Sequence, residues 1–289
     1  MSNKRRGAAL LAGLLLIAAC TQAAAVPAVV CVGEATTYLD YLTGDFQPDV
    51  QDTIEEPADT AGDLLETVQE RGVLIVSTDP NYAPQSFLNP DGSFEGFDID
   101  VATAIADGLG VDVQFETPDW DSITAGSWSE RWDISVGSMT ITTPRKDILS
   151  FTQPYYYTPA FLAASTRSGV TALDQLPFTI PDGVEPTTLT TDANCIEAIQ
   201  SGRTEFDLLI TSGTVIDDAI AADAPIVEIG EPIFVENLAV ALDKSGPPHD
   251  ALLFEMDRII GEMHADGSLT SLSEKWFDGA DLTQNPAGE

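Results

Sequence analysis

Short apolar runs alternate with amphipathic stretches through the first half of the chain. The pattern predicts strands at 73–76, 111–115 and 133–137, and helices at 64–71 and 98–109. In the longer helix the apolar residues share one face, which is typical of a helix that packs on a sheet. Because strands that alternate with helices form parallel sheets, we predict an α/β fold.

The second half continues this alternation. It contains predicted strands at 160–165, 206–210 and 238–242, and helices at 194–201 and 252–277, the last broken at Asp266-Gly267. Nearer the N-terminus, an apolar strand at 29–32 precedes a helix that opens at Thr36. Residues 47–63 are acidic, contain proline and have no periodicity, so we interpret them as a linker.

The N-terminus has the pattern of an export signal. Basic residues at 4–6 precede an apolar run at 8–19 that is too short for an ordinary membrane span. The run ends in Ile17-Ala18-Ala19-Cys20, which resembles a lipobox, where cleavage leaves a lipidated Cys20 as the first residue. Ordinary cleavage near residues 23–25 is the alternative. We therefore expect an extracytoplasmic protein of the cell envelope that is lipid-anchored to the membrane.

The charge excludes some classes of partner. The chain has 289 residues, with 12 Lys and Arg against 47 Asp and Glu, a formal net charge of -35. Phosphate binding needs clustered basic residues, so a nucleic-acid partner is excluded, and an anionic membrane surface is disfavoured as a docking site. The length suffices for two lobes that each have a core.

Two cysteines remain once Cys20 is assigned to the lipobox. An exported protein meets an oxidising environment, so we expect Cys31 and Cys195 to form a disulfide. A metal site needs more ligands than these two cysteines, His249 and His264 offer, and no cofactor is expected. A Cys–His nucleophile is compatible with the composition, but no local motif supports it.

One stretch combines hydroxyl groups with a scarce cation. Ser138-Met139-Thr140-Ile141-Thr142-Thr143-Pro144-Arg145 places one guanidinium after several hydroxyls. A guanidinium matches a carboxylate in a two-point fork, and hydroxyls and turn amides can complete the site around a small zwitterion. The alternative is a strand end whose Arg145 pairs with a surface acid.

Five blocks in sequence order resemble a known family. They are Ser77 to Pro84, Gly96 to Asp100, Gly137 to Thr142 with Arg145, Phe151 to Tyr156, and Ala265 to Leu269 with Lys275-Trp276-Phe277. Together they are similar to family 3 extracellular solute-binding proteins, the receptors of amino-acid ABC importers, from about residue 71 to residue 277.

The resemblance implies the two-lobe periplasmic-binding-protein type II fold, an α/β fold whose lobes are joined by crossing strands and close on the ligand. The expected parts are a signal peptide (1–19), a tether with a strand–helix unit (20–47), an acidic linker (48–63), lobe 1 (64–158), lobe 2 (159–244) and C-terminal helices that return to lobe 1 (245–289). It also implies a monomer that captures a small polar solute, an amino acid, for an ABC permease. Such a receptor binds its ligand and catalyses no reaction.

Carried over by position, the hydroxyl-rich block would hold the ligand backbone. The resemblance implies that Arg145 binds the α-carboxylate, while Thr140 and the Ser138 backbone contact polar groups at the α-carbon.

The other end of the ligand would meet aromatic residues. Tyr82 and Trp120 would wall the ligand side chain, because an aromatic face packs a side-chain stem and can hold a cation. Asp79 would lie at the far end of the pocket. The alternatives are plain core packing for Trp120 and a turn cap before Pro80 for Asp79.

The sequence departs from the family first in lobe 2. A strand–helix unit is missing after Leu173-Asp174-Gln175-Leu176, and a similar unit stands at residues 30–42. We hypothesise that the unit is transposed in sequence but keeps its place in space, with Cys31 beside Cys195. The helix start at Thr36 and Thr37 would then help to hold the ligand carboxylate. A disordered tail on a truncated lobe and a sequence-assembly error are the rival interpretations.

The second departure concerns the ligand ammonium. Ser212 stands where the family usually has an Asp for this group, which leaves Asp79, Asp119 and Asp217 as candidates. The runner-up function is an enzyme that resembles the cyclohexadienyl dehydratases, with Asp79 or Asp119 as acid or base. A ligand-sensing module is a third interpretation.

Overall fold

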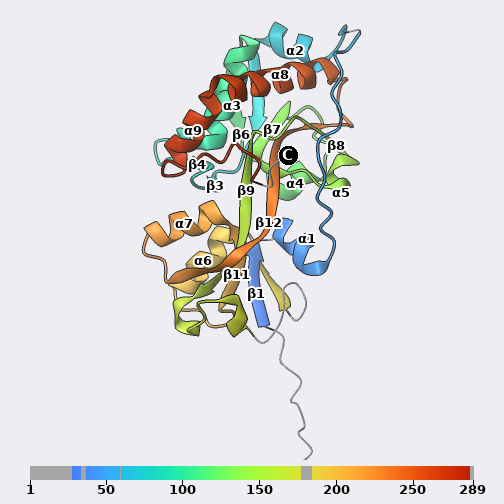
Figure 1. Cartoon of the computed structure of the whole chain (residues 1–289). Coiled ribbons are helices and arrows are strands. Elements are labelled where there is room, and N and C mark those ends of the chain that lie inside the picture. Colours follow the sequence, from blue (N-terminus) through green and yellow to red (C-terminus); the bar gives the residue numbers. More distant parts are fainter. Residues whose placement is uncertain (1–27, 34–36, 59, 177–183, 287–289) are drawn as a thin grey trace, which may run out of the picture.

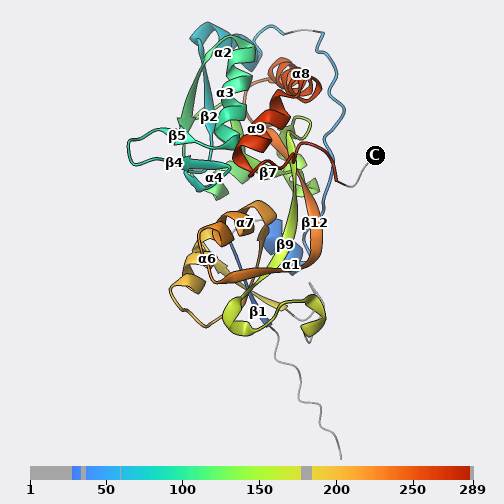
Figure 2. The same cartoon turned by 60° about the vertical axis from the view of Figure 1, so that its left-hand side comes forward.

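The computed structural model describes residues 28–33, 37–58, 60–176 and 184–286, which form two α/β lobes joined by two long strands (Figure 1). The expected signal peptide, Cys20 and Thr36 lie outside these residues. Figure 2 shows the same lobes from another side, with β9 and β12 running between them. The predicted two-lobe fold is confirmed.

The elements follow in groups. Lobe 1 contains α2 (Leu64–Arg71), β2 (Val73–Ser77), β3 (Asn81–Tyr82), β4 (Ser86–Leu88), β5 (Phe94–Glu95), α3 (Phe97–Leu109), β6 (Asp112–Glu116), α4 (Trp120–Thr124), β7 (Ile134–Thr140), α5 (Thr143–Lys146), β8 (Leu149–Phe151), α8 (Asp250–Asp266) and α9 (Ser268–Trp276). Lobe 2 contains β1 (Ala28–Gly33), α1 (Thr37–Thr43), β10 (Val184–Leu189), α6 (Asp192–Gln200), β11 (Leu208–Ser212) and α7 (Gly213–Ala221), with short 3-10 turns at Thr166–Ser168 and Leu173–Gln175. The strands that cross between lobes are β9 (Tyr156–Ser165) and β12 (Ile226–Asp243).

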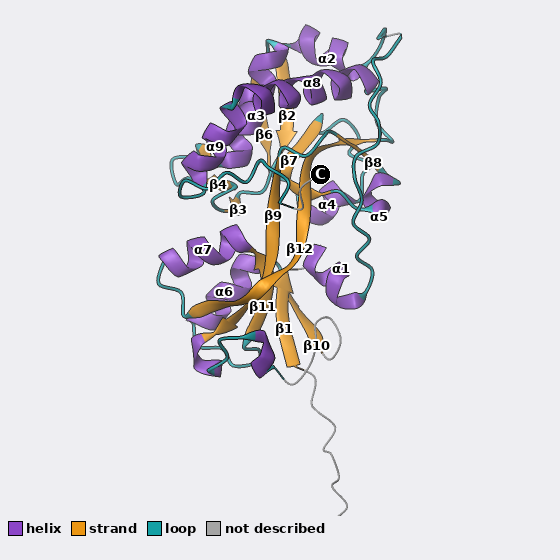
Figure 3. Ribbon diagram, in the orientation of Figure 1, coloured by secondary structure: helices purple, strands orange, loops and turns teal. Residues whose placement is uncertain are grey.

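A single mixed sheet runs through both lobes (Figure 3). Its order is β10-β1-β11-β9-β12-β7-β2-β6, with β8 also paired to β12. In this sheet the pairs that do not involve β9 or β12 are parallel, whereas β9 and β12 pair antiparallel with each other and with their neighbours. The crossing strands therefore join two parallel half-sheets into one surface. A separate small antiparallel sheet in lobe 1 has the order β3-β4-β5.

Each lobe has its own apolar core. In lobe 1 the face of α3 that carries Phe97, Val101 and Ile105 packs among buried residues of β2, β7 and α8. In lobe 2 buried residues of α6 and α7 pack against β1 and β11 around Cys31. Two separate cores allow the lobes to move as bodies about the crossing strands.

The N-terminal strand completes lobe 2. Strand β1 lies between β10 and β11 and pairs parallel with both, so that Cys31 is opposite Thr187 on one side and Leu209 on the other. A disulfide joins Cys31 to Cys195 of α6. The strand–helix unit thus occupies a central position in the second lobe, and the alternative of an unstructured tail on a truncated lobe is wrong.

Several elements differ from the predicted pattern. Strand β12 spans 18 residues, not the predicted 238–242, because its first part is a partly exposed ribbon between lobes with a register shift near Gly230. Helix α7 begins directly after β11, without a polar loop to signal its start. Strand β7 continues to Thr140, so the hydroxyl-rich block ends the strand.

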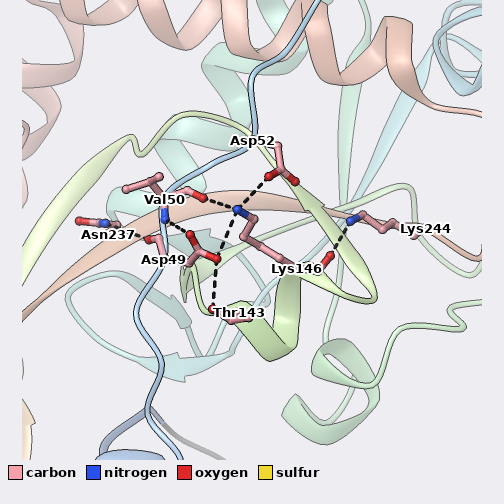
Figure 4. Close-up of polar contacts among 7 residues, drawn as sticks. All are labelled: Asp49, Val50, Asp52, Thr143, Lys146, Asn237 and Lys244. Carbon is pink, nitrogen blue, oxygen red and sulfur yellow. Dashed lines mark hydrogen bonds and ion pairs between the residues drawn. The ribbon is translucent and has the colours of Figure 1, made fainter.

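The linker after α1 is fastened to lobe 1 (Figure 4). The Lys146 ammonium lies 2.8 Å from the Asp52 carboxylate and 3.4 Å from that of Asp49, and it donates to the Val50 carbonyl at 2.7 Å. The Asn237 side chain donates to the Asp49 carbonyl at 3.2 Å. The linker is therefore a third connection between the lobes.

Candidate functional site

A cavity of about 90 Å³ lies between the lobes. Lobe 1, the N-terminal unit, lobe 2 and β12 all contribute to its wall, through Asp79, Tyr82, Trp120, Gly137, Ser138, Thr140, Thr37, Tyr38, Thr190, Thr191, Asp192 and Glu236. The lobes also touch directly, because the Gln85 amide donates to the Thr214 hydroxyl at 2.6 Å. A solute in this cavity would contact both lobes at once.

Most of the site residues predicted from the sequence border the cavity. Those that do are Thr37, Asp79, Tyr82, Trp120, Ser138 and Thr140. Arg145 is not among the described lining residues and lies behind Thr37 and Thr140, and Thr36 lies outside the described residues. The lining residues that were not predicted as site residues are Tyr38, Gly137, Thr190, Thr191, Asp192 and Glu236.

A chain of hydrogen bonds links a cation to an anion across the lobe boundary. Arg145 Nη1 donates to the Thr37 hydroxyl at 3.2 Å, and Thr37 donates to the Thr140 hydroxyl at 3.1 Å. Thr140 in turn donates to Glu236 Oε1 at 2.6 Å. Thr37 therefore acts through its hydroxyl, and this contact exists only because β1 and α1 dock in lobe 2.

Arg145 is almost fully buried at the first turn after β7. Its Nη1 also donates to the Thr140 carbonyl at 3.0 Å, and its guanidinium lies 5.8 Å from the centre of the Trp120 ring. Desolvation lowers its pKa, and the charges of Asp40 and Glu236 oppose that change. A guanidinium has five N–H donors, and among the described residues two hydrogen bonds from Nη1 are formed, which leaves donors for a carboxylate.

Glu236 is a buried acid on the crossing strand. Its carboxylate accepts hydrogen bonds from Thr140, from Tyr38 at 2.7 Å and from Thr158 at 3.1 Å. Burial raises its pKa, while these hydroxyls and Arg145 lower it in part. The signal available in the sequence was an acid placed two residues before the apolar run of the strand predicted at 238–242.

Asp192 is the first residue of α6 and is 6% exposed. Its Oδ1 accepts from the Gly33 backbone N–H at 2.6 Å, and its Oδ2 accepts from the Thr211 hydroxyl at 3.0 Å. Burial raises its pKa to about 7. Within the described part of the chain, no Lys, Arg or His forms an ion pair with it.

Ser138 has a positive φ of 55°, which is uncommon for a residue with a side chain. Its backbone N–H donates to the Tyr155 hydroxyl at 3.0 Å, and its own hydroxyl donates to Asp98 at 2.8 Å and accepts from Tyr156 at 2.6 Å. These bonds hold the strained backbone in place. The Ser138 N–H expected to contact ligand is thus already bonded within the protein.

Aromatic rings and one further acid form the remaining wall. Tyr82 and Trp120 border the cavity as half-buried side chains. Asp79 also borders it, while its Oδ1 accepts from the Asn81 backbone N–H at 2.8 Å. Asp79 is therefore both a turn cap and a cavity residue.

Residues 74–279 match the model of the bacterial extracellular solute-binding proteins, family 3. The chain belongs to this family. The L-cystine-binding protein TcyJ of Escherichia coli is 29% identical over 239 residues, which are 76% of this chain and 88% of that protein. A solved ancestral amino-acid-binding protein, described as a precursor of cyclohexadienyl dehydratase, has a TM-score of 0.64 and 27% identity, and the match covers 74% of this chain and 99% of that one.

This chain also matches an enzyme, but over a much shorter stretch. The cyclohexadienyl dehydratase of Pseudomonas aeruginosa is 31% identical over 91 residues, which are 32% of this chain and 34% of the enzyme. The two relatives described above, which are matched over most of their length, are binding proteins, and membership of this family makes the chain a binding protein as well.

The structure of this family 3 protein also bears on the ammonium partner, on membrane spans and on metal sites. Of the candidate ammonium partners, Asp119 and Asp217 are not among the described lining residues, and Asp217 borders a different pocket with Thr214 and Trp276. In the described ranges no helix is both long and apolar enough to cross a bilayer, and no cluster of three or more His, Cys, Asp or Glu is arranged for a metal ion.

Proposed function

We propose that this protein is a lipid-anchored extracytoplasmic receptor that captures an amino acid and presents it to an ABC permease. The hydrogen-bond chain from Arg145 through Thr37 and Thr140 to Glu236 carries the proposal. It places an anion, Glu236, in the wall of the cavity and a cation, Arg145, behind the two threonines of that wall, an arrangement that complements the ammonium and carboxylate of a zwitterion.

The same chain of bonds supports a closing motion. Thr37 belongs to lobe 2, Arg145 and Thr140 belong to lobe 1, and Glu236 lies on a crossing strand. A solute that binds this network gains contacts with both lobes only when they are close, so binding favours the closed form. In this proposal lobe 1 consists of residues 64–158 and 245–289, and lobe 2 consists of residues 159–244 together with the N-terminal unit. The protein would act as a monomer.

In the proposed receptor, Arg145 binds the ligand carboxylate with its remaining donors, and the hydroxyls of Thr37 and Thr140 share that contact. Tyr82 and Trp120 pack the ligand side chain. Lipid on Cys20 holds the protein at the membrane, and the acidic linker lets the N-terminal unit reach lobe 2 while the chain continues into lobe 1.

A thermal-shift screen of a soluble form that begins at Thr21 tests this function. The panel contains the twenty amino acids, L-cystine, small dicarboxylates and prephenate. Ligand at about 1,000 times Kd should stabilise the fold by about 4 kcal/mol, roughly 8–16 °C in Tm for a protein of this size. A cooperatively folded protein that responds to no amino acid would refute the proposal, and turnover of prephenate would support the enzyme instead.

Lipid anchoring has a separate test. The full chain expressed in a bacterial host should incorporate labelled fatty acid and fractionate with membranes, and Cys20→Ser should lose both properties. Label that persists in the Cys20→Ser variant would show that the anchor is wrong.

A further inference from the structure

The cavity has more acids than its zwitterion role requires. Asp79, Asp192 and Glu236 border it, and Arg145 is the one cation in contact with this network among the described residues. We propose that Asp192 and Glu236 together bind a ligand ammonium, and that the cavity selects a cationic amino acid over a neutral one. This inference rests on the proposed function and specifies its substrate class.

Asp192 has the geometry of a ligand-binding carboxylate. A carboxylate can accept about four hydrogen bonds, and each Asp192 oxygen accepts one from the described protein, from Gly33 or from Thr211. The two bonds hold the carboxylate between β1 and β11 and leave further acceptor positions on a side chain whose residue borders the cavity. A buried carboxylate without a cation is costly, so a ligand ammonium would supply the missing partner.

The position of Asp192 also explains how the site can do without an acid at 212. Thr211, which bonds Asp192, directly precedes Ser212 at the end of β11. The Ser212 hydroxyl is bonded to that of Thr214 at 2.8 Å. Asp192, at the start of α6, therefore lies against the end of β11, next to Ser212, where the family usually has an Asp.

Glu236 is the second half of this ammonium site. Burial raises the pKa of the Tyr82 hydroxyl, and the negative charges of Glu236 and Asp192 raise it further, so both acids are neighbours of this cavity residue. Thr140 connects Glu236 to the Arg145 network, so a ligand carboxylate at Arg145 would place its α-ammonium on the Glu236 side. The two acids come from lobe 2 and from the crossing strand, and an ammonium between them would join these parts.

The charge balance of the cavity specifies the ligand class. Three acidic side chains outnumber the one guanidinium, and a neutral zwitterion does not offset this excess of acids. A cationic amino acid reduces this excess, and buried charges are tolerated when they are paired. Asp79 and the ring faces of Tyr82 and Trp120 are suited to the side-chain cation.

Isothermal titration with pairs of ligands that are similar in shape but differ in side-chain charge tests the class. L-arginine is compared with L-citrulline, its neutral isostere, and L-lysine with L-norleucine. We expect each cationic ligand to bind at least tenfold more tightly than its partner, as a hydrogen-bonded charge pair warrants. A neutral amino acid that binds more tightly than its cationic counterpart, or a wild-type protein that binds neither cation, overturns the inference. If another amino acid still binds, the proposed function survives.

Substitutions test the residues. Asp192→Asn and Glu236→Gln should each weaken L-arginine binding at least tenfold, while Asp223→Asn, an exposed position in the same lobe with the same charge change, should stay within twofold. Urea unfolding of each ligand-free variant shows that it is folded. Because the two acids lie on different elements, the inference can be tested even if only one of the two variants folds. Wild-type affinity in a folded Asp192→Asn or Glu236→Gln protein overturns the role of that acid.

Discussion

Reduction of the Cys31–Cys195 disulfide should loosen lobe 2 far more than lobe 1. The bond closes a loop with a sequence separation of 164 residues, and both cysteines are fully buried in the lobe 2 core. The chain-entropy relation gives about 5 kcal/mol for a loop of this length, and measured values for disulfides are typically about 2–4 kcal/mol. Against a total stability of about 5–15 kcal/mol, this is a large share.

The effect is local because of the way β1 is attached. Strand β1 is central in lobe 2, yet its only chain connection to the rest of the described protein leads through α1 and the linker to lobe 1. Without the disulfide, β1 is kept in the lobe by its hydrogen bonds to β10, β11 and Asp192 and by its packing. Loss of β1 would separate β10 from β11 and remove Thr37 from the site.

Urea unfolding can follow the two lobes separately. The four tryptophans, Trp120, Trp128, Trp132 and Trp276, all lie in lobe 1, so their fluorescence reports that lobe, whereas far-UV circular dichroism reports both. At a slope of about 2 kcal/mol per molar urea, a loss of 2–5 kcal/mol lowers a midpoint by about 1–2.5 M.

We expect reduction to lower the dichroism midpoint by that amount and the fluorescence midpoint by less. A Cys31→Ala/Cys195→Ala protein, which cannot re-form the bond, should behave like the reduced wild type and serves as the control. Equal unfolding of oxidised and reduced protein, or free thiols at both positions before reduction, would refute the reasoning.

Three further predictions concern single side chains. Arg145→Lys keeps the charge but loses the planar fork, so amino-acid binding should weaken at least tenfold by titration calorimetry; unchanged affinity would exclude Arg145 as the carboxylate site. Burial raises the pKa of Asp98 to about 7, so the folded protein holds a proton that the unfolded chain releases near pH 4, and stability should fall as the pH rises from about 4 to about 7. Asp98→Asn should flatten this slope by up to about 1.4 kcal/mol per pH unit in urea unfolding, and an unchanged slope would contradict the assignment. Lys146→Met removes two partly exposed ion pairs, so global stability should fall by about 1 kcal/mol or less while proteolysis within residues 44–58 accelerates; equal cleavage of variant and wild type would show that Lys146 does not fasten the linker.

Local signals in the sequence were sufficient for much of the fold. Periodicity located α2, β2, α3 and β6 to within one residue at nearly every boundary, because each buries one face or one short apolar run. The transposed strand–helix unit could also be recognised in the sequence, because β1 and α1 keep the apolar pattern of a lobe 2 element at their position near the N-terminus. The two spare cysteines agreed with that placement.

The tertiary structure decided which polar residues meet. Tyr38 and Glu236 are 198 residues apart in the chain, Gly33 and Asp192 are 159 apart, and Thr37 and Thr140 are 103 apart. A single acid at a helix start or before a strand has no periodicity that would distinguish it from the many solvated acids of this chain. Its role depends on the groups that surround it after folding, because burial and hydrogen-bond partners, not residue type, set the energy of its charge.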